Sequence, residues 1–347
     1  MRSRIVISAL SLLIAGVSTL DRAAAQGAPA RPQAIDVVRY GELGFTADAA
    51  VYIAADEGFF AEQGIQVEMS RFDSAAMMVA PLATGQLDVG NGAPSAALYN
   101  AISQGLELKI VADAGQNTAS GGVVMIFSLR KDSPITNPAQ LKGAKVSLPA
   151  KGISPETDLR ALLRLGNLNM TDVEIVQMSF ADAVAALRNG SITMAMQVEP
   201  FGTRIRTSDW GKTWMVDNQV HPNHQVAVLL YGPQFVKVKS DVAKRFMTAY
   251  VKGARLYNDA FFKKDAAAKE RVLKALINHT PVKDPAVWNE MTYRAISPDG
   301  QVNMASLQED QEYFLESKLQ KAKVDLTKVV DLQYVEFANK QLGSHNK

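Results

Sequence analysis

The side chains best suited to chemistry in this chain lie mostly in loops that directly follow predicted strands. They are hydroxyls, amides, carboxylates and two phenyl rings, groups that orient a small molecule in a pocket. Phe45 and Phe201 could hold a planar or apolar molecule between them. The predicted ligand-binding residues are Phe45, Thr46, Asp48, Asn91, Ser95, Gln116, Asn117, Ser154, Thr157, Glu199, Phe201, His221 and His224. Helix capping and turn formation are the alternative for each of them.

The loop before a helix predicted over residues 156–165 has two interpretations. Free backbone N–H groups at a helix start attract anions such as carboxylate or sulfonate. Ser154 followed by Pro155 also fits an ordinary N-cap with proline at the first helical position. Glu156 and Asp158 already place negative charge in that first turn. The loop therefore permits an oxyanion ligand without requiring one.

His221 and His224 form the only closely spaced histidine pair. Their spacing is acceptable for a metal ion, but the sequence offers no evident third ligand, and Pro222 prevents a regular helix. We therefore predict no metal site here. The segment is expected to be a polar loop in which a histidine contacts the ligand or makes closure sensitive to pH.

Motifs that mark common enzymes are absent from the sequence. It contains no Gly-x-Ser-x-Gly elbow, phosphate-binding loop or His-Glu-x-x-His motif. We accordingly predict a protein that is not an enzyme, with no catalytic residue and no cofactor.

The elements that position the candidate residues follow a repeated helix–glycine–strand pattern. It occurs in residues 54–67 and 82–90, and its helix ending recurs in 185–190. Such units build open α/β sheets, whose ligands bind beyond the carboxyl ends of the strands. The predicted strands are 35–42, 65–69, 88–90, 108–112, 123–129, 145–148, 173–177, 193–198 and 226–231.

Beyond Pro233 the pattern is helical, with helices predicted over 241–262, 266–278, 285–293 and 306–322. Two similar α/β units predict two lobes, each a mixed sheet flanked by helices, with a ligand cleft between them. We expect lobe 1 to comprise residues 34–126 and 226–347, and lobe 2 residues 127–225. The chain then crosses twice between the lobes, which predicts a hinge, and the C-terminal helices cover lobe 1.

The first 25 residues are typical of a cleaved secretory signal peptide. Arg2 and Arg4 precede an apolar stretch, and small residues end at Ala25. An uncleaved anchor is the alternative. Without this segment the chain keeps 34 basic and 34 acidic residues of the 37 and 35 in the whole sequence. This balance gives no indication of nucleic acid as a partner, and the absence of cysteine removes the residue a lipoprotein anchor needs.

The ordered motifs of the chain resemble those of substrate-binding proteins of bacterial ABC importers for nitrate, sulfonates, taurine and thiamine-pyrimidine precursors. The resemblance covers residues 36–235. The matching residues are 57–60, Gly64, 85–90, Pro94, 132–135, 141–143, Gly190 and 199–200. It implies a type II periplasmic-binding-protein fold that closes on a small organic nutrient and delivers it to the transmembrane subunits of a permease.

The same resemblance implies a monomer in the periplasm. It also extends to fungal thiamine-pyrimidine synthases, which depend on a cysteine-rich iron motif that this cysteine-free chain lacks. A receptor that reports its ligand to a signalling partner is a further alternative, since it would use the same clamp. The sequence leaves open whether the ligand is a sulfonate, an aromatic carboxylate, a pyrimidine or an amide.

Overall fold

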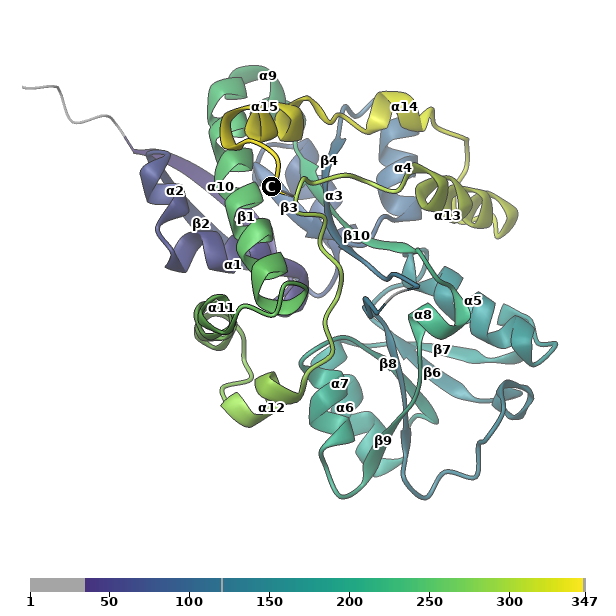
Figure 1. The fold of residues 1–347 in the computed structure, drawn as a ribbon. Coiled ribbons are helices and arrows are strands. Elements are labelled where there is room, and N and C mark those ends of the chain that lie inside the picture. The colour runs from purple at the N-terminus through teal and green to yellow at the C-terminus, as the bar shows by residue number, and fades with distance from the viewer. Residues whose placement is uncertain (1–34, 120, 346–347) are drawn as a thin grey trace, which may run out of the picture. The chain divides into compact units, whose positions relative to one another are not determined.

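Two five-stranded mixed sheets form the framework of the molecule (Figure 1). The computed structural model describes residues 35–119 and 121–345, so the predicted signal peptide lies outside the described residues. The first sheet contains β1 (Asp36–Glu42), β2 (Ile65–Arg71), β3 (Val89–Gly92), β4 (Lys109–Gln116) and β10 (Gln225–Tyr231). The second contains β5 (Ile126–Arg130), β6 (Lys145–Leu148), β7 (Glu174–Gln177), β8 (Met194–Gln197) and β9 (Gly211–Val216).

The two sheets share one topology. The first has the order β2-β1-β3-β10-β4 and the second the order β7-β6-β8-β5-β9. In each sheet three strands are parallel, and the fourth, β10 or β5, is antiparallel to both of its neighbours. Along the chain, that fourth strand is the first one after a strand of the other sheet: β5 follows β4, and β10 follows β9. The predicted two-lobed α/β fold is thus confirmed, and the segments 117–125 and 217–224 connect its sheets.

Helices cover both sheets, and the helix predicted over residues 156–165 is present, beginning one residue earlier. They are α1 (Ala49–Asp56), α2 (Phe59–Glu62), α3 (Val79–Ala83), α4 (Ala96–Ser103), α5 (Pro155–Leu165), α6 (Phe180–Asn189), α7 (Phe201–Arg206), α8 (Asp217–Val220) and α9 (Pro233–Val238). Short 3₁₀ turns occupy Thr46–Asp48, Ala75–Met78, Pro138–Leu141 and Met170–Asp172. The elements α7, β9 and α8, which follow one another along the chain, were not predicted, because their short segments have little periodic pattern.

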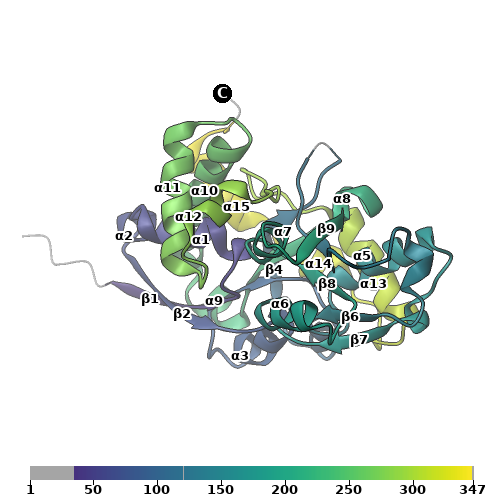
Figure 2. The same cartoon turned by 90° about the horizontal axis from the view of Figure 1, so that it is seen from below.

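The C-terminal third is helical, as predicted. It contains α10 (Ser240–Phe261), α11 (Ala266–His279), α12 (Pro285–Glu290), α13 (Met304–Glu316), α14 (Leu326–Val329) and α15 (Gln333–Leu342). The long α10 contacts α1, α11 and α15 (Figure 2). Gly253 permits the approach of α10 to α1, because a Cβ there would lie 2.1 Å from the Ala50 carbonyl oxygen. Among the described residues, no helix has the length and apolarity needed to cross a bilayer.

Two C-terminal helices end earlier than the sequence indicates. The helix predicted over 285–293 stops at Glu290, and the one predicted over 306–322 stops at Glu316. Residues 291–303 form no helix and pair through Ala295 with Gln116 at the end of β4. This irregular segment carries Arg294 into the interior. In addition, α12 contacts α7, so the C-terminal helices do not cover the first sheet alone.

Candidate ligand-binding site

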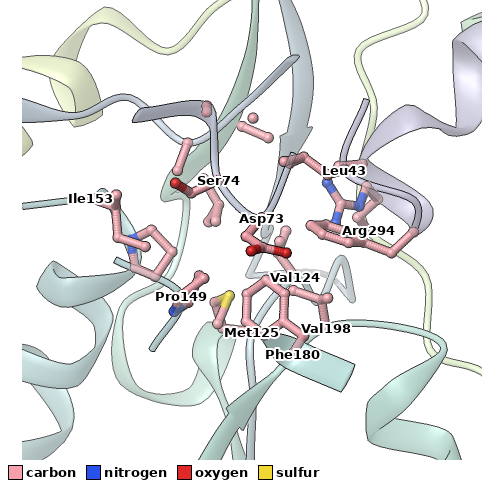
Figure 3. Close-up of a pocket in the computed structure, with 18 residues that line it drawn as sticks. Leu43, Asp73, Ser74, Val124, Met125, Pro149, Ile153, Phe180, Val198 and Arg294 are labelled. Carbon is pink, nitrogen blue, oxygen red and sulfur yellow. The ribbon is translucent and has the colours of Figure 1, made fainter. Parts of the chain in front are cut away.

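A largely apolar pocket lies where loops of the two sheets meet (Figure 3). It encloses about 430 Å³ of space free of protein atoms, open solvent at its mouth included. Its lining comes from the loops after β1, β2, β3, β6 and β8, from the segment before β5, and from β10, α6 and the 291–303 segment. Polar groups contributing to the lining include Asp73, Ser74 and Arg294.

Of the two predicted rings, only Phe45 lines this pocket. It meets Phe180 edge to face, with ring centroids 5.3 Å apart and planes at 88°. Phe201 is 5% exposed and is not among the lining residues. Phe180 was not identified as a binding residue because it begins a helix whose apolar spacing is typical of core packing.

Asp48, one of the predicted ligand-binding residues, fixes one wall of the pocket. Its carboxylate is fully buried and accepts hydrogen bonds from the backbone N–H groups of Leu43 and Gly44, at 2.9 and 2.8 Å. It also accepts from the Tyr40 hydroxyl at 2.7 Å and from the Asn91 amide at 3.2 Å. Burial is the main cause that raises the pKa of Asp48. The carboxylate therefore holds the turn that presents Leu43 and Phe45 to the pocket.

A second buried aspartate, which the sequence analysis missed, fixes another wall. Asp217 accepts from the backbone N–H groups of Val124 and Met125, at 3.1 and 2.9 Å, and both of these residues line the pocket. Burial, reinforced by the charge of Asp158, raises the pKa of Asp217 to about 7. Asp217 begins a short helix and resembles an ordinary first-turn acid in the sequence.

We expect the ligand-free protein to lose stability as pH rises from about 5 to about 7, because Asp217 holds its proton more tightly in the folded state than in the unfolded chain. Its stabilising contribution is complete below the unfolded value of 3.8 and is lost as pH rises through about 7. The free energy of unfolding should fall by at most about 1.4 kcal/mol per pH unit for this one group. Thermal melting across this range measures it.

The Asp217→Asn variant imitates the protonated acid and should melt with a flatter pH profile. The exposed Asp132→Asn variant should keep the wild-type slope, since Asp132 is outside the core. Equal slopes in all three proteins would contradict the role given to Asp217.

Glu199 links segments that are far apart in the sequence, and it is not among the residues that line the pocket. Its carboxylate accepts from the backbone N–H and hydroxyl of Thr203 and from those of Thr292, all at 2.8–2.9 Å. Its carbonyl oxygen accepts from the backbone N–H and hydroxyl of Thr46, at 3.3 and 3.1 Å. Two predicted binding residues, Thr46 and Glu199, are thus brought together. Their polar atoms make hydrogen bonds that fix the positions of these segments.

The other predicted residues near the first sheet make similar structural bonds. Asn91 donates to the Ala47 carbonyl at 2.6 Å, and Ser95 caps α4 by accepting from Leu98 N–H. Gln116 pairs through its backbone with Ala295. Asn117 donates to the carbonyl of His221 and accepts from the backbone N–H of His224, so it ties the two segments that connect the sheets.

The remaining predicted residues form one buried cluster. His224 has no exposed surface; its Nδ1 lies 2.7 Å from Asp158 and its Nε2 3.0 Å from Asp310. Ser154 and Thr157 each bond to both His224 and Asp310. Burial opposes protonation of His224, but the two carboxylates outweigh it and raise its pKa.

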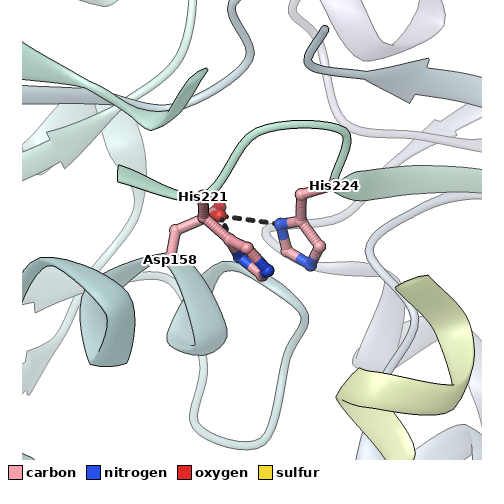
Figure 4. A group of neighbouring side chains, drawn as sticks. All are labelled: Asp158, His221 and His224. Carbon is pink, nitrogen blue, oxygen red and sulfur yellow. Dashed lines mark hydrogen bonds and ion pairs between the residues drawn. The ribbon is translucent and has the colours of Figure 1, made fainter. Parts of the chain in front are cut away.

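His221 stacks on His224 and also contacts Asp158, at 3.0 Å, so the structure supplies a third possible metal ligand (Figure 4). The ring centroids are 4.3 Å apart with planes at 26°. The lone pair of an imidazole nitrogen lies in the ring plane, so nearly parallel stacked rings direct their lone pairs side by side. This geometry disfavours one ion bound to both histidines and favours hydrogen bonds to carboxylates.

The chain as a whole is similar in sequence and in fold to several known proteins. A protein of Bacillus subtilis (strain 168), provisionally named as an aliphatic sulfonates-binding protein, is 23% identical over 346 residues, covering 96% of this chain and 98% of the relative. The periplasmic nitrate-binding protein NrtA from Synechocystis PCC 6803 superposes with a TM-score of 0.73 at 16% identity, covering 90% of each chain.

Two further solved structures are similar to this chain. The alkanesulfonate-binding protein SsuA from Xanthomonas axonopodis pv. citri, bound to MOPS, has a TM-score of 0.69 at 15% identity, covering 87% of this chain and all of that one. A desulfurization enzyme, DSZB, shares the fold with a TM-score of 0.63 at 14% identity, covering 88% of this chain and 99% of its own. The NMT1/THI5-like family model matches residues 46–259, more than half of the sequence, and this chain belongs to that family.

Proposed function

We propose that this protein is the periplasmic solute-binding component of an ABC-type importer, which captures a small organic nutrient and delivers it to the transmembrane permease. The observation that carries the proposal is the apolar pocket lined by loops of both sheets. Relatives named for binding aliphatic sulfonates, taurine and nitrate support the same role.

The proposal includes two lobes, residues 34–126 with 226–347 and residues 127–225, which close on the solute. The connections from β4 to β5 and from β9 to β10 are the hinge in this scheme, and Thr292 of the first lobe bonds to Glu199 of the second. A ligand that contacts loops of both sheets favours the closed arrangement, because it binds that arrangement more tightly. Cleavage after Ala25 and a monomeric state are parts of the proposal.

A thermal-shift screen followed by small-angle scattering tests this function. A solute at a hundred times its dissociation constant should add about 2.7 kcal/mol to the unfolding free energy. The radius of gyration should then decrease when that solute is added. If no solute in a broad set of sulfur, nitrogen and aromatic nutrients stabilises the protein, the proposed function fails.

A further inference from the structure

Two polar side chains in the pocket wall have hydrogen-bonding atoms without a partner. Ser74 is 5% exposed, and its hydroxyl makes no hydrogen bond to any described residue. Arg294 is 3% exposed, and its Nε has no acceptor among the described residues. Buried polar groups are normally satisfied by protein, water or a ligand, so these two atoms are open to a partner that enters the pocket.

Within the part of the chain that the structure describes, no carboxylate forms an ion pair with Arg294. Its guanidinium donates a hydrogen bond from Nη1 to the carbonyl oxygen of Ala114, at 3.3 Å. The carboxylates of Asp48, Asp113 and Asp217 interact with it through charge, without a direct hydrogen bond to the guanidinium. Their oxygens already accept hydrogen bonds from loop N–H groups and from side-chain donors. A buried guanidinium that stays charged and has no ion pair is costly in the empty protein.

The surrounding backbone makes room for this guanidinium. A Cβ at Gly115 would lie 2.5 Å from Arg294 Nη1 and 3.0 Å from its Cδ. The neighbouring lining is apolar and includes Val124, Met125 and Phe180. Figure 3 shows Arg294 at one side of the pocket and Ser74 at the other, with Asp73 and these apolar side chains between them.

From these observations we infer that the pocket takes an organic oxyanion, a carboxylate or sulfonate, attached to an apolar or aromatic body, and that Arg294 is its counter-charge. The oxyanion would accept from the guanidinium, the most suitable donor for such groups. The body would replace water against the apolar wall. A hydroxyl or amino group at its far end would complete the bonding of Ser74, beside the exposed carboxylate of Asp73. This inference rests on the proposed function and narrows its solute class.

The first test compares acids with neutral molecules of the same shape by calorimetry. Benzenesulfonate and benzoate should bind at least tenfold more tightly than benzenesulfonamide and benzamide, because the neutral molecules keep an acceptor oxygen but lose the negative charge that pairs with the guanidinium. Taurine, nitrate and bicarbonate should bind more weakly than benzenesulfonate, since they leave the apolar wall uncovered. Equal or tighter binding of the neutral molecules overturns the inference while leaving the proposed function intact.

The second test replaces Arg294 and follows binding and stability together. Arg294→Met should lower the affinity for benzenesulfonate at least tenfold and raise the melting temperature of the empty protein, because an unpaired buried charge is removed. A structural arginine would instead lower the melting temperature when replaced. The exposed Arg164→Gln variant should change neither quantity. A lower melting temperature in Arg294→Met, or unchanged affinity, refutes the assignment.

Gly115→Ala provides a test that leaves the arginine in the chain. The added methyl group should displace the guanidinium and reduce the preference for benzenesulfonate over benzenesulfonamide. An unchanged preference contradicts the position given to Arg294. Failure of every acid and every neutral molecule to bind, in the wild type as well, would count against the proposed function itself.

Discussion

Replacing Asp310 with asparagine should lower the free energy of unfolding by about 3–5 kcal/mol, the range observed when one partner of a buried ion pair is removed. Asp310 and His224 are both fully buried, with Oδ1 and Nε2 3.0 Å apart. Asp158 holds the other ring nitrogen at 2.7 Å. The His224 imidazolium, directly before β10, thus lies between Asp158 on α5 and Asp310 on α13. It connects these two helices. Asparagine removes one of the two charges that balance this cation.

Glu309, the neighbouring residue on α13, provides a matched control. Its carboxylate contacts His221 at 3.2 Å, but its side chain is 59% exposed. Glu309→Gln should therefore cost less than about 1 kcal/mol, as exposed ion pairs do. Denaturant unfolding of the three proteins measures both values. Similar losses for the two variants would show that the buried charge cluster contributes little to stability.

The members of this cluster show what sequence reasoning could and could not identify. Ser154, Thr157, His221 and His224 were selected because of their positions at a helix start and in a connecting loop. Asp158 was interpreted only as a first-turn acid, and Asp310 was not considered. The separation of 86 residues between His224 and Asp310 explains the omission. A helix periodicity indicates which face is buried but not which distant carboxylate meets it.

The order of strands and helices could be predicted because the glycine-terminated helices and short apolar strands are local signals. The pocket residues could not be predicted equally well. Polar residues in the right loops use their atoms in hydrogen bonds to neighbouring protein groups: Asp48 and Glu199 accept from backbone N–H groups, and Asn91 donates to a carbonyl oxygen. Buried loops need such acceptors, since unpaired backbone groups are costly there. The pocket is therefore lined mainly by apolar residues. Sequence patterns do not distinguish such residues from those of the hydrophobic core.

Arg294 was missed for a different reason. Its segment follows a helix predicted to reach residue 293, whereas α12 ends at Glu290. Trp288 and Met291 are buried and fit a helical spacing, so the apolar pattern continues past the true end. Tertiary hydrogen bonds, from Thr292 to Glu199 and between Ala295 and Gln116, replace the helical ones. These partners lie far away in sequence and give no local signal.

A second large loss of stability is expected for Asp48→Ala, at least about 3 kcal/mol. The backbone N–H groups of Leu43 and Gly44 would lose their shared acceptor, at about 1–3 kcal/mol for each buried group, and the Tyr40 hydroxyl would lose its own. Denaturant unfolding measures the total. Amide hydrogen exchange at Leu43 and Gly44 measures the local effect and does not depend on the identity of the ligand.

A graded series separates the role of the Asp48 carboxylate from the cost of an empty space. Asp48→Asn keeps one oxygen and nearly the same volume, so it should recover part of the lost stability and slow exchange at Leu43 and Gly44. Asp132→Ala, at a side chain that is 67% exposed, should leave both measurements unchanged. If Asp48→Ala and Asp48→Asn are equally stable, the hydrogen bonds do not hold this turn. If exchange at Leu43 and Gly44 stays slow in both variants, other contacts fix the wall of the pocket.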